Sequence, residues 1–180
     1  RVGPIYTNAP PESFKEELLI ALNVEKTTEE QEFHPIEKNL GKLQTTITKY
    51  CRDKAFRARI LEIYNYKCAA CGKGLSCPTG LKEIEAAHII PRSFAGANDA
   101  RNGIAFCKAH HWAFDQGLFW IDENREIYVP QAVRDIKENL DIKTLHRRKL
   151  ATPTIEKLEP DTRALEWHRE NLGYGFRNEI

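Results

Sequence analysis

The sequence contains no methionine, and its hydrophobic residues, 41% of the total, form no run long enough to cross a membrane. A membrane-spanning helix needs about 18 to 20 consecutive apolar residues. The first six residues, Arg1-Val-Gly-Pro-Ile-Tyr6, also lack the apolar core of a secretory signal. These absences predict that the chain has no membrane partner and a cytoplasmic location.

An excess of charge of one sign is missing as well, because 27 Lys and Arg residues are balanced by 26 Asp and Glu residues. A large positive charge would favour nucleic acid as a partner, and a net charge of +1 gives no such indication. A nucleic-acid surface would therefore depend on local clusters. The run His146-Arg147-Arg148-Lys149 is one such cluster.

The length of 180 residues suits one domain with an extension. Because the chain begins at Arg1 and has no Met, we expect it to be part of a longer protein. Residues 1–50 are predicted to form an arm, a helix and a linker, since His34-Pro35 interrupts any helix there. Residues 51–180 hold the clustered Cys and His residues and are predicted to form the main domain.

Hydrophobic periodicity predicts an α+β fold. Helices are expected where apolar residues recur every three or four positions, and strands in short apolar or alternating runs. Residues 133–140 are ambiguous between helix and strand. The predicted helices are 13–24, 48–66, 108–116 and 161–172, and the predicted strands are 84–90, 104–106 and two within 118–130.

Five cysteines, without a secretory signal, indicate metal binding or redox chemistry before a disulfide framework. Two residues separate Cys68 from Cys71 and also separate Cys107 from His110. Two such half-sites predict a closed tetrahedral Cys3His site for structural zinc, a zinc knuckle. The alternatives are a redox pair at Cys68 and Cys71, for which the βαβ context is absent, or unliganded core cysteines. The remaining cysteines are Cys51, expected to be packed in a helix, and Cys77, which could replace one ligand.

Residues 84–115 concentrate side chains that bind metal ions or transfer protons, including three of the six histidines. His111 and Asp115 are four residues apart on the predicted helix, so they project from one face and suit two ligands of one ion. His110 and His111 point about 100° apart on that helix, which suits two separate roles. His110 is predicted to bind zinc and His111 to belong to a second site, which His88 could also face.

Three motifs in this stretch together resemble the His-Asn-His motif of HNH endonucleases, which have the ββα-metal nuclease fold. They are Ala87-His88-Ile-Ile-Pro91, Asn102-Gly-Ile-Ala-Phe-Cys107 and His111-x-x-Phe114-Asp115-x-Gly117. Residues 114–122 and 164–170 are similar to the HNH group of bacterial restriction enzymes, in which the nuclease often follows a domain that reads DNA or its modified bases. The resemblance covers about residues 55–172. It implies a ββα-metal core with a Cys3His zinc knuckle and flanking helices.

The resemblance also implies a role for each polar residue of the motif. His88 would be the general base that removes a proton from the attacking water, and His111 would bind the catalytic Mg2+ or Mn2+. Asn102 would fix the loop that orients His88 or bind the metal, and Asp115 would be a further ligand. The sequence departs from the family at Ala87, because relatives commonly have a metal-binding Asp or His at this position. The ligand set of the catalytic metal therefore stays open.

We therefore predict a metal-dependent endonuclease that hydrolyses double-stranded DNA, as the nuclease part of a bacterial restriction or defence enzyme. Specificity would come from an upstream DNA-recognition domain or from a homodimer. The alternatives are a zinc-stabilised DNA-binding module with a decayed nuclease site, which Ala87 favours, and RNA as the substrate. The predicted phosphate contacts are Arg92, Arg101, Arg147, Arg148 and Lys149.

Overall fold

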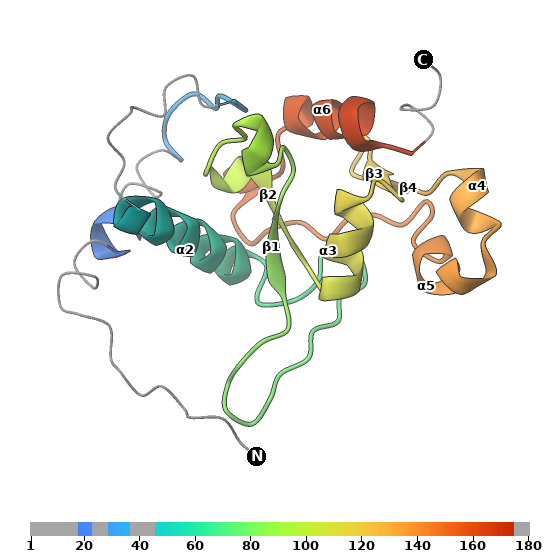
Figure 1. Ribbon diagram of the computed structural model, residues 1–180, viewed down its shortest axis with the longest axis horizontal. Coiled ribbons are helices and arrows are strands. Elements are labelled where there is room, and N and C mark those ends of the chain that lie inside the picture. Colours follow the sequence, from blue (N-terminus) through green and yellow to red (C-terminus); the bar gives the residue numbers. More distant parts are fainter. Residues whose placement is uncertain (1–17, 23–28, 37–45, 175–180) are drawn as a thin grey trace.

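The computed structural model describes residues 18–22, 29–36 and 46–174, which combine helices with short strands, as predicted (Figure 1). The predicted helix 13–24 is helical at residues 18–22, and its remainder lies outside the described residues. Within the described ranges, no helix has the length and apolar character that crossing a bilayer requires. The helices are α2 (Thr46–Ile63), α3 (Lys108–Asp115), α4 (Gln131–Arg134), α5 (Leu140–Lys143) and α6 (Thr162–Leu172), the 3-10 helices are η1 (Arg92–Phe94), η2 (Ala100–Asn102), η3 (Lys137–Asn139) and η4 (Glu156–Leu158), and the strands are β1 (Glu85–His88), β2 (Gly103–Phe106), β3 (Trp120–Ile121) and β4 (Ile127–Tyr128).

The centre of the molecule is the antiparallel pair of β1 and β2, which lies between α2 and α3 (Figure 1). Glu85 pairs with Phe106 and His88 pairs with Gly103. Because side chains alternate along a strand, Glu85 and Ala87 share one face of β1 and His88 is on the other. α2 covers the His88 face closely, since a Cβ on Gly103 would lie 2.5 Å from the Ile60 side chain. Only glycine allows this approach.

α2 packs on the strand pair through buried Phe56, Ile60 and Ile63. It ends at Ile63, earlier than the predicted Tyr66. The reason is that Asn65 and Tyr66 have positive φ angles of 51° and 55°, which a right-handed helix does not accommodate. The chain thus turns sharply just before Cys68. Cys51 is buried on α2 beside Ala21 and Ala55, which confirms the prediction that it is a packed residue.

The C-terminal part of the chain packs against α3. The two predicted strands of 118–130 are confirmed as the antiparallel pair β3 and β4, and the ambiguous region 133–140 is helical and irregular. Asp161 caps α6 by accepting a hydrogen bond from the backbone N–H of Arg163. On α6, buried His168 stacks on Phe114 of α3, with ring centroids 3.7 Å apart, and donates a hydrogen bond from Nε2 to the Phe114 carbonyl at 3.1 Å. Residues 114–122 and 164–170 therefore meet in space.

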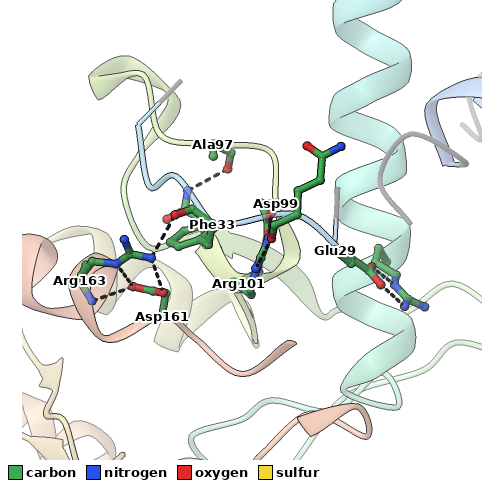
Figure 2. Close-up of polar contacts among 10 residues, drawn as sticks. Glu29, Phe33, Ala97, Asp99, Arg101, Asp161 and Arg163 are labelled. Carbon is green, nitrogen blue, oxygen red and sulfur yellow. Dashed lines mark hydrogen bonds and ion pairs between the residues drawn. The ribbon is translucent and has the colours of Figure 1, made fainter. Parts of the chain in front are cut away.

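Residues 29–36, predicted to belong to a linker, lie across the core as an ordered segment (Figure 2). Phe33 is only 3% exposed. The guanidinium carbons of Arg101 and Arg163 lie 5.0 and 5.6 Å from the centroid of its ring. Cation–π contacts of this kind add to the burial of the ring. His34 is exposed, as predicted.

Charged side chains fix the first part of this segment, between Glu29 and Phe33 (Figure 2). Arg101 donates to the carbonyl of Gln31 at 3.0 Å, and Arg163 donates to the carbonyl of Phe33 at 3.0 Å. Glu29 binds Arg59 of α2 through two hydrogen bonds of 2.6 and 2.8 Å. Segment 29–36 therefore connects α2, η2 and the start of α6.

Truncation of Phe33 tests whether this segment stabilises the core. We expect Phe33→Ala to lower the free energy of unfolding by about 3 kcal/mol, because a buried aromatic ring and its two guanidinium contacts are lost. Urea denaturation followed by circular dichroism measures the change. The matched control is His34→Ala, an exposed neighbour, for which a change within about 0.5 kcal/mol is expected. Equal stability of the two variants would contradict the role of the segment.

Candidate active site and metal centre

Cys68, Cys71, Cys107 and His110 form a compact cluster in which the four candidate ligand atoms all lie within 4.8 Å of one another. The Nδ1 atom of His110 is 3.3 Å from the Cys68 sulfur and 3.2 Å from the Cys107 sulfur. Three sulfurs and one imidazole nitrogen at these separations suit a tetrahedral metal ion. The two predicted half-sites are thus brought together as one candidate metal centre.

Backbone hydrogen bonds explain why these distant residues converge. The turn at 68–72 closes when Gly72 N–H donates to the Cys68 carbonyl at 2.8 Å, and Gly72 has a φ of 73°, which favours glycine. Ala69 N–H then donates to the carbonyl of Ala105 on β2 at 2.8 Å. Since β2 leads directly into Cys107 and the first turn of α3, this bond aligns the two half-sites.

The cluster is partly buried, with Cys68 and His110 inside and Cys71 and Cys107 partly exposed. Burial raises the pKa of Cys68 to about 12 and also raises the pKa of Cys107, because a buried thiolate loses its hydration. Burial likewise lowers the pKa of His110, which keeps the imidazole neutral and able to bind metal. A bound divalent cation would compensate the buried thiolate charges. Cys77 is exposed and lies outside the cluster.

His88 lies at the end of β1 and is half-buried on the α2 face. Its ring stacks on Phe56, with centroids 3.9 Å apart and planes inclined by 12°. Its Nε2 is 2.8 Å from Oδ1 of Asn98, in the loop between the strands. Burial lowers the pKa of His88, and Arg92 and His111 lower it further by charge repulsion, whereas the hydrogen bond to Asn98 and the charge of Asp53 raise it. The neutral imidazole, which can accept a proton, is therefore favoured near neutral pH.

Asn102 is fully buried at the other end of that loop. Its Oδ1 accepts a hydrogen bond from Ile90 N–H at 2.9 Å. Its Nδ2 donates to the carbonyls of Ile90 at 3.1 Å and Ala97 at 2.9 Å. Both polar atoms of the amide are thus bonded to the backbone of the loop. These bonds also explain why β1 does not reach Ile90: Ile89 N–H still bonds to the Asn102 carbonyl in the register of the pair, but Ile90 N–H bonds to the Asn102 side chain.

His111 is half-buried on α3 and lies between two carboxylates. Its Nδ1 is 2.8 Å from a carboxylate oxygen of Glu85, and its Nε2 is 3.5 Å from Oδ2 of Asp115. Burial raises the pKa of Asp115, and the neighbouring Glu85 charge adds to this rise, whereas His111 lowers it. Sequence reasoning missed Glu85. The available signal was its position two residues before Ala87, which puts both side chains on the same face of β1.

The predicted second site thus spans both faces of β1. His88 contacts α2 residues, whereas His111 contacts Glu85 on the α3 side. Among the described residues β1 pairs with β2 alone, so its other edge carries no paired strand. Ala87, where relatives commonly have a metal ligand, is fully buried. His88 and the partner of His111, Glu85, therefore lie on opposite faces of β1.

The predicted phosphate contacts fall into two groups. Near η1 and η2, Arg92 donates to the Gly96 carbonyl, and Arg101 is largely buried against Asp99, with an ion pair of 2.7 Å. The other three are exposed and lie beside β4, where Glu126 bridges to Lys149. Glu126 also lies 3.5 Å from Arg147 and 3.4 Å from Lys149. Arg147, Arg148 and Lys149 therefore form an exposed basic strip on the β3–β4 side.

A family model described as HNH endonuclease matches residues 68–122. A comparison with curated proteins finds no match. Among solved structures, a modification-dependent TagI restriction endonuclease is similar, with a TM-score of 0.52 and 18% identity over 65% of this chain. The match covers 37% of that protein, and at this identity it shows a similarity of fold. Over residues 68–122, which contain the metal cluster and all three motif residues His88, Asn102 and His111, the resemblance to the HNH endonuclease family is thereby confirmed.

Proposed function

We propose that this chain is a metal-dependent endonuclease that hydrolyses phosphodiester bonds of double-stranded DNA, with β1, β2 and α3 as a ββα-metal core. The observation that carries the proposal is the pair of histidines His88 and His111, held by separate partners beside one strand edge within the family match. One histidine suits proton transfer, and the other suits metal binding. The Cys3His cluster at the start of α3 supports the same core.

His88 is the general base of this proposal. Its lowered pKa leaves the imidazole neutral near pH 7, so that it can take a proton from the attacking water. Burial on the α2 face and the stack on Phe56 limit its rotation. A fixed base orients the water with little loss of entropy in the transition state.

His111 and Asp115 would hold the catalytic ion, Mg2+ or Mn2+. Their Nε2 and Oδ2 atoms lie 3.5 Å apart on one face of α3, so a small adjustment would bring both to one ion. When bound, the ion neutralises charge on the scissile phosphate and on the leaving 3′ oxygen. Glu85 accepts the hydrogen bond from Nδ1 of His111 and so directs Nε2 toward the ion.

The resemblance implied two possible roles for Asn102, fixing the loop or binding the metal, and we assign it the first. Its amide is fully buried, and turning its oxygen outward to a metal would break the bonds that the amide makes to Ile90 and Ala97. Breaking them would leave buried backbone groups unpaired, which costs about 1–3 kcal/mol for each group. We therefore propose that Glu85, and not Asn102, is the polar partner of His111 from this part of the chain. Glu85 lies on the same face of β1 as Ala87.

The Cys3His cluster is proposed to hold structural zinc, which would link the turn at 68–72 to the start of α3. Arg92 and the exposed strip Arg147, Arg148 and Lys149 are the proposed phosphate contacts. Arg101 is assigned instead to Asp99 and the segment 29–36, because its guanidinium is largely buried there. A restriction role, with residues 51–180 as the nuclease domain beside a DNA-recognition domain, is supported by the similarity to TagI.

A second candidate is a zinc-stabilised DNA-binding module with a decayed nuclease site. The absence of a donor side chain at Ala87 favours it. Cleavage of supercoiled plasmid that stops in EDTA and requires His88 distinguishes the nuclease from this module. The same assay with RNA tests the alternative substrate.

Replacement of the proposed base tests the mechanism. We expect His88→Ala to reduce plasmid nicking in Mg2+ or Mn2+ by about 100- to 10,000-fold, because the water loses its proton acceptor. Gel quantification of nicked plasmid over time gives the rate, and His34→Ala is the matched control for an exposed histidine. Circular dichroism and metal content verify that the variant keeps its fold. Wild-type activity in a folded His88→Ala protein would refute the mechanism.

Metal analysis tests the structural zinc. Mass spectrometry of the purified protein is expected to find about one tightly bound zinc per chain, and Cys71→Ser is expected to lose most of it, because one of four ligands is removed. Cys77→Ser is the matched control and keeps the zinc, since Cys77 lies outside the cluster. A stably folded wild-type protein without zinc would eliminate this part of the proposal.

A further inference from the structure

Beyond the residues of the family motif, two side chains form a hydrogen-bonded chain that ends on His88. Asn98, from the loop between β1 and β2, has its Oδ1 2.8 Å from Nε2 of His88. Its Nδ2 donates to a carboxylate oxygen of Asp53 on α2 at 3.1 Å. Asn98 is 6% exposed. The chain Asp53–Asn98–His88 thus joins α2, the loop and β1.

The carboxylate determines the direction of every hydrogen bond in this chain. An ionised carboxylate only accepts hydrogen bonds, so the Asn98 group that faces Asp53 has to be the NH2 donor. The amide oxygen of Asn98 then faces His88, and an oxygen of this kind only accepts. Nε2 of His88 therefore carries the hydrogen, and in the neutral ring the lone pair is on Nδ1.

We propose that Asp53 and Asn98 are positioning residues that hold His88 in the Nε2–H form, so that Nδ1 is the atom that accepts the proton of the attacking water. The proposal rests on the proposed function of His88 as the base. The positioning role itself, however, concerns which nitrogen of His88 carries the hydrogen in the protein without substrate, and it can be measured without any assay of activity. Loss of the carboxylate would remove the constraint that orients Asn98, and with it the fixed hydrogen on Nε2.

The charges around His88 support the same arrangement. Asp53 on α2 raises the pKa of His88, whereas Arg92 of η1 and His111 of α3 lower it. Asp53 also stabilises the imidazolium that forms when Nδ1 takes a proton, because it places a negative charge on the far side of Asn98. Phe56 stacks on one face of the ring and hinders the 180° flip that would put Cε1 in the place of Nε2 beside Asn98.

The test is nitrogen-15 NMR of the imidazole, which distinguishes a protonated from an unprotonated ring nitrogen without any assay of activity. In the full wild-type chain we expect His88 to be in the Nε2–H form above its pKa. In Asp53→Asn we expect a mixture of the two forms and a lower His88 pKa. The control is Asp135→Asn, at an exposed position after α4 where the carboxylate accepts a hydrogen bond from Gln131, and it is expected to leave His88 unchanged. Asn98→Ala tests the middle of the chain and is expected to give the same mixture.

The kinetic arm uses the same variants. We expect Asp53→Asn to lower kcat/KM for plasmid nicking by about 10- to 100-fold. The acidic limb of its pH profile should move to lower pH, because the base loses a neighbouring negative charge. A residue that only stabilised the fold would change the unfolding curve and leave this limb where it is.

Each result has one meaning for the proposal. A wild-type His88 with its hydrogen on Nδ1, or an Asp53→Asn variant with an unchanged ring form and pKa, would overturn the positioning role. Failure of the proposed function is a separate outcome. If the wild type cuts no DNA, or if His88→Ala cuts normally, the base assignment fails whatever the NMR result.

Discussion

The candidate site depends on one buried amide. Asn102 bonds with both of its polar atoms to the backbone of the loop that joins β1 to β2, at Ile90 and Ala97. This loop carries Asn98, which contacts His88, and its end continues into β2 and Cys107. In a dry interior each of these bonds is costly to break, because no water replaces it. The position of His88 and the position of the metal cluster therefore share one support.

The local parts of this arrangement could be predicted from the sequence. The Cys68 and Cys107 half-sites have short internal spacings, and a residue pair such as His111 and Asp115 at helical spacing is determined by the helix itself. The order of strand, loop, strand and helix followed from hydrophobic runs. Their boundaries were less accurate: α2 ended early at a turn with positive φ angles, and β1 ended where the Asn102 bonds began.

Contacts between residues distant in the sequence could not be predicted in the same way. Asp53 lies 45 positions before Asn98 and Glu85 lies 26 before His111, and nothing in their local sequence names these partners. The charge of Arg101 suggested a phosphate contact, but its partner is Asp99, and its neighbour is the ring of Phe33. The sequence alone does not show which carboxylate will pair with a given Arg or Lys, because the fold determines the partner. For this reason the linker interpretation of residues 29–36 also missed their packing on the core.

The edge of β1 unites these observations. Because side chains alternate along the strand, His88 faces α2 and Glu85 faces α3. The proposed base and the proposed metal ligand His111 are therefore supported by different helices and share no hydrogen-bond partner. Each helix supplies a carboxylate, Asp53 through Asn98 on one side and Asp115 directly on the other. Ala87, between them, is fully buried and contributes packing instead of a donor. Although Ala87 offers no ligand, the strand still places an acidic side chain beside His111, because Glu85 lies on the same face two residues earlier.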